Sequence, residues 1–163
     1  MDPIKTIQEI NSKHNLKFNE AAHRYTIENS FVLESVTTKL KNFFPFDAKK
    51  VSQIIAEQRG VTPETIIQEW NQIRDNGTRV HLLAERFCNK EELTESEKEE
   101  IKHVIQFFED NPHFEVLGSE VRVFSKKYVV AGTVDLMLRN IKDNKVYLLD
   151  WKTSAKEIEC EKH

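Results

Sequence analysis

The segment LLDWKTSAK (residues 148–156) places an acid and a lysine two positions apart at the end of an apolar run. Because successive side chains of a β-strand point to opposite faces, Asp150 and Lys152 project to the same side, roughly 7 Å apart at a rise of about 3.3 Å per residue. Trp151 points the other way, which favours packing against a helix. Such a charged pair is either a solvated strand end or half of a metal site.

Two more acids interrupt the β-like runs that precede this segment. Asp135 lies in YVVAGTVDLML (residues 128–138) and Glu120 in FEVLGSEVRVF (residues 114–124). Burying such acids unpaired on one sheet face would cost several kcal/mol each. A divalent cation compensates this cost, and hard oxygen ligands suit Mg²⁺ or Mn²⁺. We therefore predict a site for one or two Mg²⁺ or Mn²⁺ ions.

Simpler interpretations exist for each residue taken alone. An isolated D-x-K is common and is usually a solvated strand end. Asp135 could pair with Arg139, and Glu120 with Arg122, as surface ion pairs. The combination favours a metal site: G-x-x-D, a turn, an apolar run ending in D-x-K-T, and a further acid one strand upstream.

The elements that must position these residues follow from the hydrophobic pattern. Residues 114–124, 128–138 and 145–151 are rich in β-branched and aromatic side chains and predict three consecutive strands. Residues 16–33 alternate apolar and polar side chains, which predicts a small hairpin or meander. Helical patterns occupy residues 35–44, 47–60, 62–87 and 94–111.

Capping signals bound several of these helices. Asp47 and Thr62 are predicted N-caps, and Thr94 with Glu97 forms a predicted capping box. We expect Gly77 to interrupt the helical pattern, which resumes over residues 78–87. The segment from Thr94 reads as one helix that ends at Asn111-Pro112.

The order of elements predicts the fold class. A small β element, several helices and three strands indicate an α/β (α+β) domain with a mixed, mostly antiparallel sheet flanked by helices. The length of 163 residues fits one domain. We divide it into a hairpin and short helix (16–46), a helical part (47–111) and the strands that carry the site (114–154).

Composition narrows the function classes. The net charge of −3 excludes a polycationic tail but not a local basic groove. Cys88 and Cys160 are far apart and form no C-x-x-C unit, so we expect neither a disulfide framework nor an iron–sulfur cluster. The N-terminus resembles no signal or transit peptide, and no apolar run reaches membrane-spanning length. We expect a soluble, intracellular protein without a membrane partner.

These motifs resemble the PD-(D/E)XK nucleases, in the branch of RecB-type domains, lambda exonuclease and the mitochondrial genome maintenance exonuclease. AGTVDLML resembles the motif with the first acid, and LLDWKTS resembles the (D/E)-x-K motif. The segment from Trp70 to His81 is similar to the branch's G-T-x-x-H helix, and HRYTIENSFVLESVTTKL resembles the N-terminal lead-in of some phage and viral members. The likeness spans about residues 16–155.

The resemblance implies a restriction-endonuclease-like core and a metal-dependent DNA nuclease, most simply an exonuclease, in DNA repair, recombination or viral genome processing. Asp135 and Asp150 would hold the metal, and His81 and the Trp151 carbonyl would complete the first site. Lys152 would act on the attacking water, and Glu120 on a second ion or a bound water. Without the resemblance, His81 reads as a structural residue that could pair with Glu85.

Candidate contacts to the phosphate backbone of single- or double-stranded DNA come from cations and donors near the motifs. They are Arg74, Arg79, Lys126, Lys127, Thr153 and Ser154, each of which could instead be a solvated surface residue. Phe43, Phe44 and Phe46 could form a base-stacking platform, or they could be core residues or a plug at a helix end.

Two features depart from the family. Val134 stands where the family name has proline, a frequent variation. The Q-x-x-x-Y helix of RecB-type members is absent, since none of the 11 residues after Lys152 match it. A fragment, a shortened variant, or a chain completed by a missing segment or partner would explain this. The rival functions are a catalytically inactive nuclease-fold module that binds DNA or protein, and a plain α+β interaction domain without metal.

Overall fold

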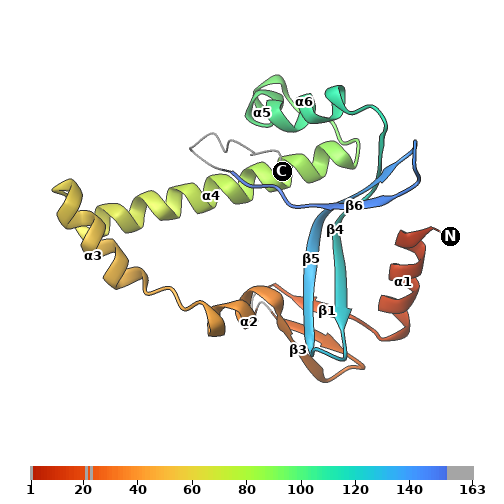
Figure 1. Cartoon of the computed structure of the whole chain (residues 1–163), viewed down its shortest axis with the longest axis horizontal. Helices are drawn as coiled ribbons and strands as arrows, with labels where there is room; N and C mark the ends of the chain where they lie inside the picture. The colour runs from red at the N-terminus through yellow and green to blue at the C-terminus, as the bar shows by residue number, and fades with distance from the viewer. Residues whose placement is uncertain (1, 21, 23, 154–163) are drawn as a thin grey trace.

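The computed structural model describes residues 2–20, 22 and 24–153, and Figure 1 shows the arrangement of its elements. The helices are α1 (Pro3–Lys13), α2 (Val36–Phe43), α3 (Ala48–Arg59), α4 (Pro63–Cys88), α5 (Glu95–Glu100) and α6 (Lys102–Asp110). The strands are β1 (Lys17–Asn19), β2 (Arg24–Ile27), β3 (Phe31–Ser35), β4 (Phe114–Ser125), β5 (Val130–Asn140) and β6 (Val146–Leu149).

The strands form one six-stranded sheet with β5 at its centre. β1, β2 and β3 make the antiparallel meander expected from residues 16–33. β4 pairs with β5 antiparallel along nearly its whole length. On the other edge of β5, β3 pairs in parallel at Val130 and Ala131, and β6 pairs antiparallel from Leu136 to Arg139. The predicted mixed, mostly antiparallel sheet flanked by helices is therefore confirmed.

The break between β3 and β6 leaves residues 132–135 of β5 without a ladder partner on that edge. Val36, the first residue of α2, lies close to Gly132 there, with its Cγ2 3.5 Å from where a Cβ would stand. Asp135 lies at the end of this unpaired stretch, next to the first residue that pairs with β6. The topology therefore leaves Asp135 beside a break in the ladder.

The predicted caps are present. The Asp47 carboxylate accepts a hydrogen bond from the Lys50 amide, and the Thr62 hydroxyl accepts one from the Thr65 amide. Thr94 and Glu97 form the reciprocal capping box. Each side chain satisfies an amide that the first helical turn leaves without a partner.

Two helix predictions are wrong. Gly77 does not interrupt the pattern, because α4 runs continuously for 26 residues from Pro63 to Cys88. The segment 94–111 is not one helix, because it divides at Ile101, whose φ of −112° and ψ of 23° leave the helical region. This break buries Ile101 against Leu83 and Ala84 of α4.

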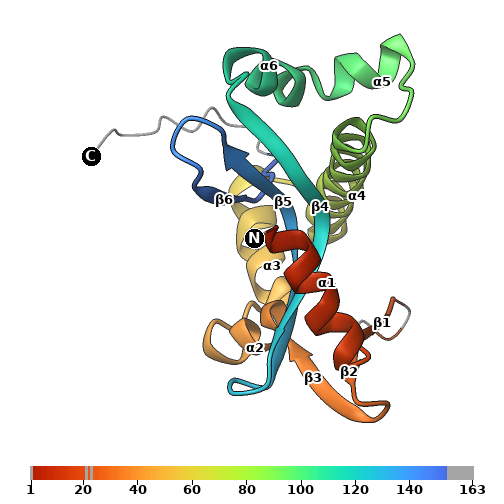
Figure 2. The same cartoon turned by 90° about the vertical axis from the view of Figure 1, so that its right-hand side faces the viewer.

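Helix α1 was not expected from the sequence. The Asp2 carboxylate caps it, and Pro3 occupies its first turn. It packs on β4, where the Ile4 side chain lies against Gly118 and the Asn11 amide donates to the Arg122 carbonyl at 2.8 Å. Figure 2 shows α1 lying along β4.

The core consists of packed clusters around the sheet. One lies under the meander and contains Tyr25, Ile27, Leu33 and Ala131. Others join α4 and α6 to β5, where Leu136 and Leu138 are fully buried. Among the described residues, no helix combines the length and apolar character needed to cross a bilayer.

Candidate metal centre

Three side chains from three elements meet where α4 crosses the β4–β5 hairpin. His81 comes from α4, Glu120 from β4 and Asp135 from β5, and one ligand atom of each lies within 4.8 Å of the others. The α4 helix presents His81 because its apolar side packs on Ile101, α6 and the sheet through Leu83, Ala84 and Phe87. Packing of the core thus holds an imidazole beside two carboxylates.

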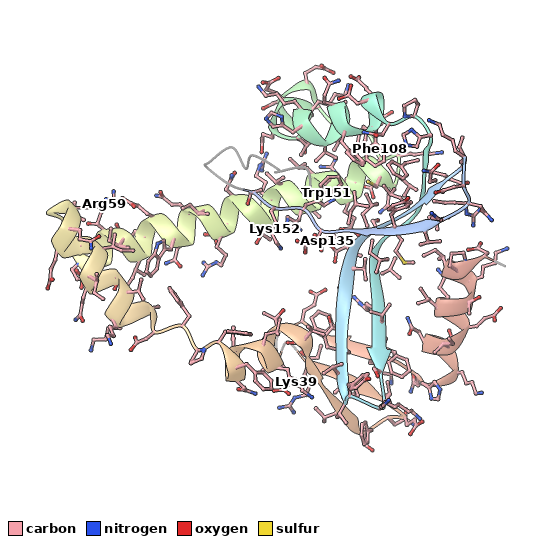
Figure 3. The ribbon with its side chains drawn as sticks, in the orientation of Figure 1. Lys39, Arg59, Phe108, Asp135, Trp151 and Lys152 are labelled. Atoms are coloured by element: carbon pink, nitrogen blue, oxygen red, sulfur yellow. The ribbon has the colours of Figure 1, made fainter. Side chains whose placement is uncertain are left out.

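Asp135 is held in place by two of its neighbours. Its Oδ2 accepts a hydrogen bond from the Trp151 amide at 2.9 Å and lies 3.3 Å from His81 Nδ1. The Trp151 amide lies just beyond β6, which ends at Leu149. The Asp135 carboxylate therefore accepts the hydrogen bond that a backbone carbonyl of β5 would accept if the β5–β6 ladder continued. Figure 3 shows Asp135, Trp151 and Lys152 close together where β5 meets α4.

Glu120 has an unusual backbone. Its φ of 47° lies in the left-handed region, which costs a residue with a side chain on the order of 1–3 kcal/mol. The ladder pairs Ser119 with Leu136 and Val121 with Val134, so Glu120 stands opposite Asp135. Strain of this kind persists only where surrounding contacts impose it, and it concentrates at functional sites.

The charge environment of Glu120 is also unusual. The residue as a whole is exposed, yet partial burial of its carboxylate and, next, the Asp135 charge raise its pKa above the ordinary value. The nearby His81 and Arg122 oppose this rise in pKa without cancelling it. Two carboxylates in one cluster therefore repel each other, and a cation would relieve that repulsion.

A glycine lets the chain approach α4 next to this cluster. A Cβ on Gly77 would stand 3.0 Å from Thr153 Oγ1, so any side chain there would press on the segment after β6. Gly77 and Thr153 line a pocket of about 500 Å³ together with His81 and Glu120. The close approach explains why an interior helix position carries glycine in spite of its cost of about 1 kcal/mol relative to alanine.

Asp150 and Lys152 lie outside the three-residue cluster. They form an ion pair with each other, and their side chains are 60% and 73% exposed. The predicted strand over residues 145–151 is too long, because β6 ends at Leu149. The alternation that was expected to project both side chains onto the sheet face therefore does not extend to them.

Trp151 packs as the sequence predicts, with its ring edge-on to Phe107 of α6 at 6.0 Å between centroids. Its amide donates to Asp135, which is a different contact from the metal-bound carbonyl that the resemblance implies. Asp135 and His81 do not take the simpler partners that their sequence neighbourhoods suggested. Arg139 pairs with Glu115 at 3.5 Å, and His81 contacts Asp135 rather than Glu85.

The candidate phosphate-binding residues are scattered. Arg74 pairs with its neighbour Asp75, and Arg79 forms a two-bonded pair with Glu100. Lys126 pairs with Glu28 at the far end of the β4–β5 hairpin, where Lys127 lies over the Tyr128 ring. Thr153 lines the pocket beside His81, and Ser154 lies outside the described residues.

The aromatic residues between α2 and α3 are not core. Phe43, Phe44 and Phe46 are 70%, 76% and 65% exposed, so the alternative that they are core residues is wrong. Phe46 alone has an aromatic neighbour among the described residues, Trp70 of α4, at 5.7 Å between ring centroids.

Comparisons with known proteins add no family: no family model matches the chain, and no curated protein or solved structure matches it. The nuclease resemblance therefore rests on the sequence motifs alone. The chemistry of the cluster is compatible with it, since two carboxylates and one imidazole form a donor set for a divalent cation such as Mn²⁺.

Proposed function

We propose that this chain is a divalent-metal-dependent DNA nuclease with a restriction-endonuclease-like core. The observation that carries the proposal is the meeting of His81, Glu120 and Asp135, which are far apart in sequence. His81 and Asp135 belong to the motifs that resemble the nuclease family, and Glu120 is the further acid one strand upstream. A strained Glu120 with a raised pKa strengthens it, because both features are typical of functional sites.

His81, Glu120 and Asp135 would hold Mg²⁺ or Mn²⁺ through one imidazole nitrogen and two carboxylate oxygens. Once bound, the ion lowers the pKa of a coordinated water and offsets the charge on the scissile phosphate. The Trp151 amide fixes the Asp135 carboxylate by donating to Oδ2. Hydrogen bonds of this kind, from groups that do not themselves touch the metal, orient the side chains that bind it.

Lys152 would stabilise the negative charge that develops on the phosphate. Its ion pair with Asp150 is exposed, and exposed pairs contribute about 0–1 kcal/mol, so Lys152 can exchange this partner for a phosphate at little cost. Asp150 would then be able to join the site. The reaction is hydrolysis: a water oxygen bonds to phosphorus, the P–O3′ bond breaks, and a 5′-phosphate and a 3′-hydroxyl result.

One observation favours a second candidate function. Asp150 and Lys152 pair with each other outside the cluster, an arrangement expected of a nuclease-fold module that binds DNA or protein without cleaving it. Such a module would still gain stability from a divalent cation through the three clustered residues.

Cleavage of end-labelled single- and double-stranded DNA in Mn²⁺, Mg²⁺ or EDTA tests the proposal. We expect degradation in Mn²⁺ or Mg²⁺ and none in EDTA, with loss of activity in Asp135→Asn and Lys152→Ala. Glu115→Gln is the matched control, because Glu115 is an exposed acid on the same strand as Glu120 and lies outside the cluster. Metal-dependent stabilisation without cleavage would favour the binding module, and neither effect would leave a plain α+β domain.

A further inference from the structure

An exposed apolar surface covers the connection between α2 and α3. Its members are Leu40, Phe43, Phe44 and Phe46, which we call the aromatic patch, and each is at least half exposed. Soluble proteins rarely expose large contiguous apolar patches, and such patches mark interaction sites. The nuclease site described above does not use these side chains.

Lysines flank the patch in the sequence although the protein as a whole is acidic. The segment from residue 39 to residue 50 holds four lysines and a single acid, Asp47. Asp47 caps α3 through its carboxylate. Within the described part of the chain, Lys41, Lys49 and Lys50 are exposed and have no ion-pair partner.

Exposed aromatic rings interleaved with unpaired cations suit a single-stranded polynucleotide. Bases stack on aromatic side chains whatever their sequence, and lysines contact the phosphates between them. An apolar protein partner would not need the lysines, and duplex DNA would hide its base faces from the rings. The charge complementarity therefore favours an unpaired nucleic-acid strand over these alternatives.

One side of α4 leads from the patch to the metal centre. Phe46 contacts Trp70, and Trp70, Gly77 and His81 recur at spacings of seven and four residues, which places them on one helix face. The eleven residues from Trp70 to His81 span about 16 Å, or roughly five nucleotides at 3.4 Å per base. Exposed Ile73 lies between them and lines the pockets beside both His81 and Lys152.

We propose that the aromatic patch binds the bases of a single-stranded polynucleotide and leads the strand along α4 toward the His81–Glu120–Asp135 cluster. The second half of this statement rests on the proposed nuclease function. The first half does not, because a stacking platform binds without metal or cleavage.

The test is fluorescence anisotropy of labelled dT12 and U12 with the full chain in EDTA, where no metal-dependent cleavage occurs. Phe44→Ala should raise Kd for dT12 about fivefold or more, since stacking on an aromatic side chain contributes that much per base. Phe44→Trp should restore binding, and Phe44→Leu should not. Leu148→Ala is the control, because Leu148 is an apolar residue on β6 that is also largely exposed, at 64% against 76% for Phe44.

A second variant examines the role of the lysines. Lys49→Gln with Lys50→Gln should flatten the dependence of log Kd on log salt by about 0.7 for each phosphate that a lysine no longer neutralises. Since no group of the patch selects the sugar, U12 should bind within a few fold of dT12. A dodecamer duplex should bind more weakly than dT12.

Several results would overturn the proposal. These are no binding of dT12 or U12, equal affinity for Phe44→Ala and the unaltered protein, or full binding by Phe44→Leu, which would indicate apolar packing rather than stacking. Self-association that Phe44→Ala abolishes would assign the patch to a second copy of the chain. Cleavage of DNA that is unaffected by Phe44→Ala would reject the role of the aromatic patch in leading the strand to the metal centre, but not the nuclease function. Binding of dT12 without any cleavage of DNA in Mn²⁺ or Mg²⁺ would reject the nuclease function, but not the binding of the strand by the patch.

Discussion

The Glu120→Gln substitution separates the metal centre from an ordinary surface cluster, because its effect should reverse sign with metal. In EDTA the substitution removes one of two carboxylates whose ligand atoms lie within 4.8 Å. At a water-like dielectric constant, two charges at that distance repel by about 1 kcal/mol. The variant should therefore melt about 2–4 °C higher than the unaltered protein in EDTA.

In Mn²⁺ the order of the two melting temperatures should invert, so that the unaltered protein melts above Glu120→Gln. A metal present at one hundred times its Kd stabilises the folded state by about 2.7 kcal/mol, which for a chain of this size is a rise in Tm of about 5–11 °C. Glu120→Gln removes one of three ligands and should lose most of that rise. Thermal unfolding in EDTA and across a MnCl₂ series, followed by intrinsic fluorescence, measures both effects.

The same experiment decides the part played by Asp150. The sequence motifs predict that Asp150→Asn abolishes the Mn²⁺ effect, whereas its exposed pairing with Lys152 predicts that the effect remains. Glu115→Gln should behave like the unaltered protein in both media. Equal Mn²⁺ stabilisation of Glu120→Gln and the unaltered protein would refute the assignment of Glu120 as a ligand, and a Mn²⁺ effect on neither would refute the metal centre.

The pH dependence of stability provides an independent check of the metal centre. Because the pKa of Glu120 is raised in the folded state, the stability linked to this group is present at low pH and is lost as the pH rises through that pKa. Deprotonation is also what allows metal binding. Mn²⁺ stabilisation should thus decline on acidification at a higher pH than an ordinary glutamate would require, and at constant metal the decline should be visible in Tm.

Three further predictions concern the scaffold. The Thr94 amide and then Arg86 lower the pKa of Glu97 to about 2 from 4.5, so its contribution to stability is present above pH 4.5 and is lost as the pH falls toward 2; urea midpoints of Glu97→Gln and the unaltered protein should converge over that interval. Leu138→Ala should cost about 2–5 kcal/mol in urea denaturation because Leu138 is fully buried, and a loss under about 1 kcal/mol would contradict its place in the core. Burial and then Glu85 raise the pKa of Cys88 to about 11, so in a Cys160→Ser variant the remaining thiol should react with iodoacetamide at pH 8 at least about tenfold more slowly in the folded state than in urea.

Local structure in this protein follows from short-range patterns in its sequence. Alternation marked the meander, β-branched runs marked β4 and β5, and capping residues such as Asp47, Thr62 and Thr94 marked where helices begin. These features depend on neighbours within a few residues, so the pattern of types and spacings carries them. The same signal was present for α1, where Asp2 precedes Pro3, and it could have been recognised.

Long-range packing determined the features that no local pattern carries. Gly77 lies inside a continuous helix, and the close approach of Thr153, 76 residues later, favours glycine at this position. β6 ends at Leu149, and the Trp151 amide that follows donates to the Asp135 side chain. The motif residues Asp150 and Lys152 therefore lie outside the strand, and strand alternation does not place them on the sheet face. The sequence predicted Glu120 and Asp135 on one sheet face and, through the family resemblance, His81 in a metal site with Asp135. That these three meet without Asp150 depends on how α4 packs across the β4–β5 hairpin, which is a property of the whole core.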